Sequence, residues 1–154
     1  MNDAHLHLIV NHFPVVAPVL GLLVFITGYA TRSAVIKRVA CALFIFGAVA
    51  ALAAGATGER AEEATEHLTG FSHELIHEHE EAAEVFIISS YILGFAAALG
   101  LWVNYKKYRL TALVNLIILV CAIVTIILSA RAGTTGGEIR HTEIRGDSPE
   151  AISE

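Results

Sequence analysis

Four long stretches that contain no charged residue and no histidine restrict this chain to one kind of fold. They run from residues 13 to 31, 39 to 58, 85 to 105 and 110 to 130. A bilayer's hydrocarbon core is about 30 Å thick and takes about 20 helical residues to cross, and a backbone inside it must satisfy its own hydrogen bonds. The sequence therefore predicts an all-α protein, an integral membrane four-helix bundle.

The basic residues predict how this bundle is oriented. The loop between the first two stretches holds Arg32, Lys37 and Arg38, and the loop between the last two holds Lys106, Lys107 and Arg109. Basic loops stay in the cytoplasm, so both termini and residues 59–84 should lie outside. The opening MNDAHLH has no positive region, so we expect the first stretch to be a span and not a cleaved signal peptide. The expected location is a bacterial inner membrane, N-out and C-out.

The chain is short enough to be one unit with a tail. Residues 1–135 form the expected bundle, with residues 59–84 as a His/Glu-rich outer cap. Residues 136–154 form the expected outer tail, whose end we predict to be disordered. The double glycine at 136 and 137 is expected to turn this tail back, so that Arg140 and His141 face the bundle.

Charge and polarity exclude several classes of function. The net charge of -5 sums an acidic outer face and a basic inner face, and neither resembles a nucleic-acid surface. The partner of the spans is the lipid bilayer. Ion and proton transporters need ionisable groups along their path, and the four stretches offer none. Function is therefore expected at the outer end.

Small residues and prolines predict how the spans pack. Gly47, Ala51 and Gly55 recur every four residues in the second stretch, as do Gly94 and Ala98 in the third. Such spacing lets helix backbones approach closely. In the first stretch, Pro18 is expected to kink the helix.

All eight histidines lie in the predicted outer segments. They are His5, His7, His12, His67, His73, His77, His79 and His141. Imidazoles and carboxylates that converge at helix ends are ligands of first-row metals, and neutral imidazole is also an axial ligand of haem. The motif for covalent c-type haem, CxxCH, is absent from the sequence.

The main hypothesis is a b-type haem in the outer mouth of the bundle. Its two axial ligands are expected to be His12, on the first span, and His79, at the head of the third. Arg131 and Arg140 are expected to face the haem propionates, because guanidinium groups suit carboxylates. Two axial imidazoles leave no open position, so this hypothesis predicts electron transfer rather than oxygenase or peroxidase chemistry.

Two alternatives remain open. The first is a Zn, Cu or Fe site at the same end, in which carboxylates are direct ligands. Its expected ligands are His7, His12, His79, His141, Glu62, Glu66 and Glu80. The second is a cofactor-free structural subunit that docks onto a larger membrane complex. The protein partners considered are a periplasmic redox protein, such a complex, and a second copy of the chain in a homo-oligomer.

The segment HLIVNHFP, residues 7–14, resembles the HPxLVHFP opening of a bacterial membrane family known as domain of unknown function 2231. TGERAEEATEH, IHEHEEAAEV and GGEIRH also resemble members of this family, so the likeness covers nearly the whole chain. Leu8 and Asn11 depart from the opening motif, where the family has proline and valine. The positions that the resemblance marks are His7, His12, Glu62, His79, Glu80 and His141. Some family members are fused to cytochrome c-like or Rieske-like domains, which implies a redox setting.

Overall fold

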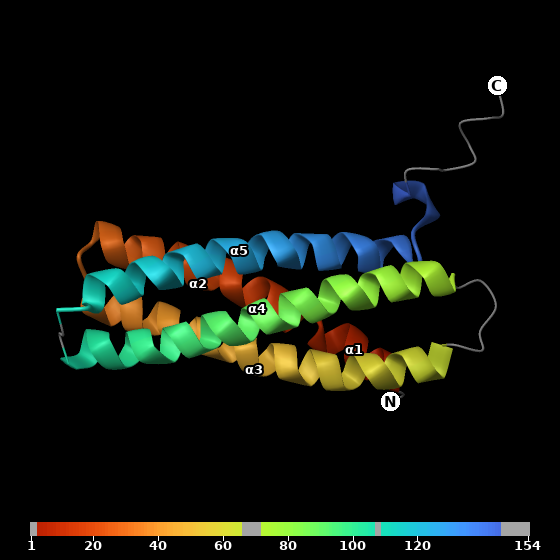
Figure 1. Cartoon of the computed structure of the whole chain (residues 1–154), viewed down its shortest axis with the longest axis horizontal. Coiled ribbons are helices and arrows are strands. Elements are labelled where there is room, and N and C mark those ends of the chain that lie inside the picture. The colour runs from red at the N-terminus through yellow and green to blue at the C-terminus, as the bar shows by residue number, and fades with distance from the viewer. Residues whose placement is uncertain (1–2, 66–71, 107–108, 146–154) are drawn as a thin grey trace, which may run out of the picture.

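The chain folds into a long bundle of helices, as predicted (Figure 1). The computed structural model describes residues 3–65, 72–106 and 109–145, and for residues 3, 4 and 61–65 only the backbone is described. The elements are α1 (Asp3–Val10), α2 (His12–Ala30), α3 (Ala34–Thr65), α4 (His73–Lys106), α5 (Thr111–Glu138) and the short 3-10 helix η1 (Thr142–Ile144). Four segments are long and apolar enough to cross a membrane: His5–Ala30, Ala34–Arg60, His73–Lys106 and Thr111–Glu138.

The bundle has two chemically different ends (Figure 1). At one end α2 leads into α3, and α4 leads towards α5. We call this the basic end, because Arg32, Lys37, Arg38, Lys106 and Arg109 flank these connections. At the opposite end lie α1, the start of α4 and the end of α5. We call this the histidine end.

The four long helices surround the bundle axis in chain order. Helix α2 packs along α3, α3 along α4 and α4 along α5, and a smaller contact between α5 and α2 closes the ring. Helices α2 and α4 therefore lie diagonally opposite each other and run in the same direction, as do α3 and α5. This arrangement has an approximate two-fold axis along the bundle.

The buried residues repeat in the same way. At one constant offset, five buried residues of α2 correspond to five buried residues of α4: Pro14 to Phe86, Pro18 to Ser90, Gly21 to Leu93, Phe25 to Ala97 and Gly28 to Gly100. At a second constant offset, buried residues of α3 correspond to those of α5: Ala40 to Ile118, Phe44 to Ala122, Gly47 to Thr125, Ala51 to Ser129 and Ala54 to Ala132. The two halves of the chain thus use the same helix faces for their shared core.

Glycines allow the close packing that their spacing predicted. A Cβ added at Gly47 would lie 3.2 Å from the Cβ of Ala17 on α2. One added at Gly55 would lie 3.3 Å from the Cδ1 of Ile87 on α4. Gly94 faces Ala48 on α3 so closely that a side chain there would overlap it. Close backbone approach gives these helices dispersion contacts that lipid-exposed surfaces lack.

A pair of buried amides joins α4 to α5 near the basic end. The Nδ2 of Asn104 donates to the Oδ1 of Asn115 at 2.7 Å and to the carbonyl of Gly100 at 2.7 Å. The Nδ2 of Asn115 donates back to the Oδ1 of Asn104 at 3.4 Å. Each amide satisfies the other, as buried polar groups within a membrane require.

A turn at Asn11 and the course of the double glycine were not predicted. The turn separates α1 from α2, although Asn11 keeps helical backbone angles and its N–H donates to the carbonyl of His7 at 2.9 Å. Pro14 explains this, because it has no N–H to donate to the carbonyl of Val10. At the other terminus, α5 continues through Gly136 and Gly137 to Glu138, so the double glycine does not turn the chain. The turn follows at residues 139–141, where the N–H of His141 donates to the carbonyl of Gly137 at 2.9 Å.

Candidate cofactor site

Two histidines point into the histidine end of the bundle, one from each half. His7 on α1 and His79 on α4 are both partly buried and lie beyond the uncharged stretches of their helices. They also occupy corresponding positions in the repeat, because the offset that relates α2 to α4 relates His7 to His79. The two imidazoles therefore approach the two-fold axis from opposite sides.

Each imidazole is held by a threonine of the neighbouring helix. The Nδ1 of His7 lies 3.1 Å from the Oγ1 of Thr57 on α3, and the Nδ1 of His79 lies 3.2 Å from the Oγ1 of Thr135 on α5. Thr57 and Thr135 are again corresponding positions. The two hydrogen bonds make the same connection in each half of the protein.

The hydrogen bonds of the threonines assign the imidazole protons. The hydroxyl of Thr57 donates to the carbonyls of Ala53 and Ala54, at 2.9 and 3.1 Å. That of Thr135 donates to the carbonyls of Arg131 and Ala132, at 3.3 and 3.2 Å. Because each hydroxyl has one proton and directs it to these carbonyls, we assign the proton of each imidazole to Nδ1. This assignment leaves the lone pair on Nε2, as in a metal-ligating histidine.

Both imidazoles are kept neutral by their surroundings. Burial lowers the pKa of His7, against a smaller effect of a hydrogen bond to the backbone of Ala54. Burial also lowers the pKa of His79, against a hydrogen bond to the backbone of Ala132. A charge on His7 would lower the pKa of His79 further, so the two rings are within electrostatic range of each other. Neutral imidazole is the form that binds a metal or a haem iron.

Glycines make room for these rings. A Cβ at Gly136 would lie 2.9 Å from the Cε1 of His79, and a Cβ at Gly58 would lie 3.4 Å from the Cε1 of His7. Each imidazole thus packs on a Thr-Gly dipeptide: His7 on Thr57-Gly58 and His79 on Thr135-Gly136. Sequence reasoning missed these four residues, although a Thr-Gly dipeptide at the end of two spans was visible in the sequence.

A buried acceptor without a partner lies next to His7. The Oδ1 of Asn11, one helical turn after His7, is buried and has no hydrogen-bond partner in the part of the chain that the structure describes. An unsatisfied buried amide oxygen costs about 1–3 kcal/mol, so such an atom needs a donor or a cation. Sequence reasoning noticed Asn11 only as a departure from the family motif.

His12 does not belong to this arrangement. It is exposed at the start of α2, and its Nδ1 donates to the carbonyl of Leu8 at 2.9 Å. Five residues separate His12 from His7, which places the two on different helix faces. His7 and His79 are thus the partly buried histidines that bond to neighbouring helices, whereas His12, which the main hypothesis paired with His79, is exposed.

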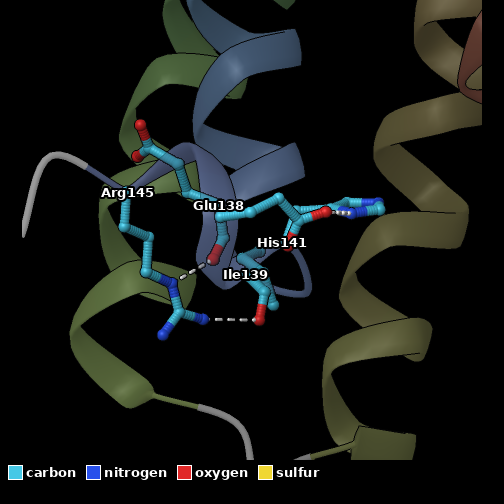
Figure 2. Close-up of polar contacts among 5 residues, drawn as sticks. Glu138, Ile139, His141 and Arg145 are labelled. Atoms are coloured by element: carbon cyan, nitrogen blue, oxygen red, sulfur yellow. Dashed lines mark hydrogen bonds and ion pairs between the residues drawn. The ribbon is translucent and has the colours of Figure 1, made fainter. Parts of the chain in front are cut away.

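The tail histidine is engaged locally at the end of α5. Figure 2 shows His141 and Arg145 close to the end of α5. The Nδ1 of His141 lies 2.8 Å from the Oε1 of Glu143. Hydrogen bonds to its own backbone and to His141 lower the pKa of Glu143. Arg145 donates to the carbonyls of Glu138 and Ile139, at 2.7 and 3.1 Å, and so satisfies free acceptors at the helix end. Arg131 and Arg140 are both exposed.

The carboxylates of the predicted metal site do not join the imidazole pair. Glu80 is largely exposed and lies 3.7 Å from the Nδ1 of His77. Glu66 and the side chain of Glu62 lie outside what the structure describes. Among the described residues, no group of three or more His, Cys, Asp or Glu side chains is placed to hold a metal ion.

The four apolar helices define a helical membrane protein. A family model described as predicted membrane protein (DUF2231) matches residues 4–143, and the chain belongs to this family. No curated protein and no solved structure matches the chain significantly.

Proposed function

We propose that this protein binds a b-type haem at the histidine end and transfers electrons there. The observation that carries the proposal is the pair of partly buried imidazoles, His7 and His79, each with its Nδ1 hydrogen-bonded to a threonine of the neighbouring helix. The donor set fits this cofactor, because a porphyrin supplies four ligands and iron needs two more. A bound haem would supply a reversible one-electron couple.

The surrounding residues fit a permanently held centre. Thr57 and Thr135 fix the orientation of the rings, and the small residues Gly58 and Gly136 leave them space. A haem iron held by both His7 and His79 would offer no coordination site to a small substrate, which favours electron transfer over oxygen chemistry. Arg131 and Arg140 remain the proposed partners of the propionates.

A mononuclear metal ion is the second candidate, and Asn11 supports it. Its buried Oδ1 could add an oxygen ligand to the two imidazoles, and water would complete the shell of Zn, Cu or Fe. This set is smaller than the one expected from the sequence, because Glu80 and His141 are exposed and paired elsewhere.

The visible spectrum of the detergent-purified protein tests the proposal. A bis-imidazole haem gives sharp reduced-state bands that CO does not shift. His7→Ala and His79→Ala should each remove the haem or open it to CO. His12→Ala is the matched control and should change nothing.

Loss of the spectrum in His12→Ala, with an unchanged spectrum in His7→Ala, would restore the pair expected from the sequence and refute the present one. A colourless protein that carries one equivalent of Zn, Cu or Fe would favour the second candidate. A colourless and metal-free protein would favour the remaining alternative, a cofactor-free structural subunit.

We also propose that the histidine end faces the periplasm of a bacterial inner membrane, because basic loops are retained in the cytoplasm. A periplasmic redox protein or a larger membrane complex would then be the electron partner.

A further inference from the structure

The surface between α3 and α4 is hollowed near the basic end. A cavity of about 430 Å³ opens there, lined by Arg38, Ala98, Leu101, Trp102 and Tyr105. Four of these five side chains are apolar or aromatic, and Arg38 brings the single full charge. This cavity lies at the opposite end of the bundle from the imidazole pair.

The terminal nitrogens of Arg38 donate no hydrogen bond to any residue that the structure describes. Its Nε donates to the carbonyl of Ala34 at 3.3 Å, and its guanidinium lies 5.8 Å from the ring centroid of Tyr105. No carboxylate pairs with it in the described part of the chain, and the sequence places no Asp or Glu between Asp3 and Glu59 or between Glu84 and Glu138. A partly buried guanidinium without an internal anion favours an anion from outside.

The depth of the cavity matches the zone of lipid headgroups. Arg38 immediately precedes the uncharged stretch 39–58, and Tyr105 ends the uncharged stretch 85–105. Trp and Tyr are enriched at this membrane–water boundary. Ala98 and Leu101 precede Tyr105 on α4 and lie closer to the membrane centre, where an acyl chain would run.

We infer that this cavity binds an anionic phospholipid, whose phosphate pairs with Arg38 while an acyl chain covers Ala98 and Leu101. Basic pockets between membrane helices take such headgroups. The apolar lining favours a lipid over free phosphate, since free phosphate would gain nothing from it.

Trp102 offers a direct test, because it is the only tryptophan of the chain. The whole protein is placed in nanodiscs that mix phosphatidylcholine with phosphatidylglycerol, and bromine is put on the acyl chains of only one of the two lipids. Bromine quenches tryptophan on contact. We expect phosphatidylglycerol to be enriched about fivefold beside Trp102, the size typical of one basic side chain at an anionic interface.

Two variants distinguish a specific lipid site from a general electrostatic attraction of anionic lipid to the protein. Arg38→Gln should abolish the enrichment. Lys37→Gln removes the same charge, but the Nζ of Lys37 lies over the Tyr29 ring, 5.1 Å from its centroid, and not in the cavity. This variant should keep the enrichment. If Arg38→Gln does not fold by circular dichroism, Arg38→Lys replaces it and should weaken the enrichment, because it loses the planar fork.

Three results would overturn the inference. They are equal quenching by the two brominated lipids, the same change in the Arg38 and Lys37 variants, and a change of Trp102 emission on adding inorganic phosphate to pure phosphatidylcholine discs. The last result would indicate an anion site that needs no lipid.

Discussion

Replacing Gly136 by alanine should disturb the imidazole pair while leaving the bundle as stable as before. The new Cβ would lie 2.9 Å from the Cε1 of His79 and 3.2 Å from its Nδ1, whereas ordinary contacts begin at 3.4 Å. The ring must therefore move by about half an ångström. Because the Nδ1 of His79 already lies 3.2 Å from the Oγ1 of Thr135, this movement should break that hydrogen bond.

The expected stability follows from two opposing effects. A lost hydrogen bond costs about 0.5–1.5 kcal/mol. Alanine in place of a helical glycine gains about 1 kcal/mol. The two effects cancel, so the free energy of unfolding should change little. Gly133 provides the matched control one turn earlier on α5, because a Cβ there meets nothing within 4 Å. Gly133→Ala should therefore keep the whole gain, about 2–4 °C in Tm.

Thermal unfolding in detergent and the nitrogen NMR signals of histidine measure these effects. Gly136→Ala should show an unchanged Tm and a changed Nδ1 signal of His79. Gly133→Ala should show a raised Tm and unchanged signals. If both variants raise the Tm equally and both leave His79 unchanged, the ring does not pack on Gly136 and the site as described is wrong.

Three further predictions concern the pH dependence, the buried amides and the topology. Burial lowers the pKa of His7 and His79, so their neutral forms contribute to the free energy of unfolding. This contribution should be full above the unfolded pKa of about 6.5 and be lost as pH falls through the folded pKa values. Unfolding measured from pH 8 to 5 should show a smaller loss of stability in the double variant His7→Gln/His79→Gln. Asn115→Ala should destabilise by about 1–3 kcal/mol, because it leaves the buried Oδ1 of Asn104 without a donor, and in a double-mutant cycle Asn104→Ala/Asn115→Ala should cost less than the sum of the single changes. A cysteine at the exposed position Glu78, in a chain with Cys41 and Cys121 replaced by alanine, should react with an impermeant thiol reagent from the periplasmic side; reaction only from the cytoplasmic side would reverse the proposed orientation.

The spans could be predicted from the sequence, but the inward faces of the helices could not. Absence of charge over a membrane's thickness is a strong signal. Around each span, however, lipid-facing and core-facing residues are equally apolar, as exposed Phe95 and buried Phe86 on α4 illustrate. In a water-soluble protein, polar residues mark the outward face of a helix and apolar residues the inward face. This difference is missing here, so nothing in the sequence identified His7 as the inward histidine.

The turn at Asn11, between the two N-terminal histidines, was not predicted either. It was predictable that proline would disturb the first span, but Pro14 and Pro18 were both candidates. The break one turn before Pro14 separates His7 on α1 from His12 on α2. The role of Gly136 could not be predicted for a related reason. A glycine in a sequence indicates a turn unless it is known that a side chain, here the imidazole of His79, packs against it.

The repeated architecture has a consequence for how the site is assembled. Residues 3–65 carry His7 with its threonine, and residues 72–145 carry His79 with its own, so neither half holds a complete site. Because both halves belong to one chain, the effective concentration of one half for the other is of the order of millimolar. Two fragments that are expressed separately should therefore complement each other through the interface of α3 with α4, and ligand binding should then depend on fragment concentration. In the intact chain that dependence is absent, because a contact between two halves has become an intramolecular one.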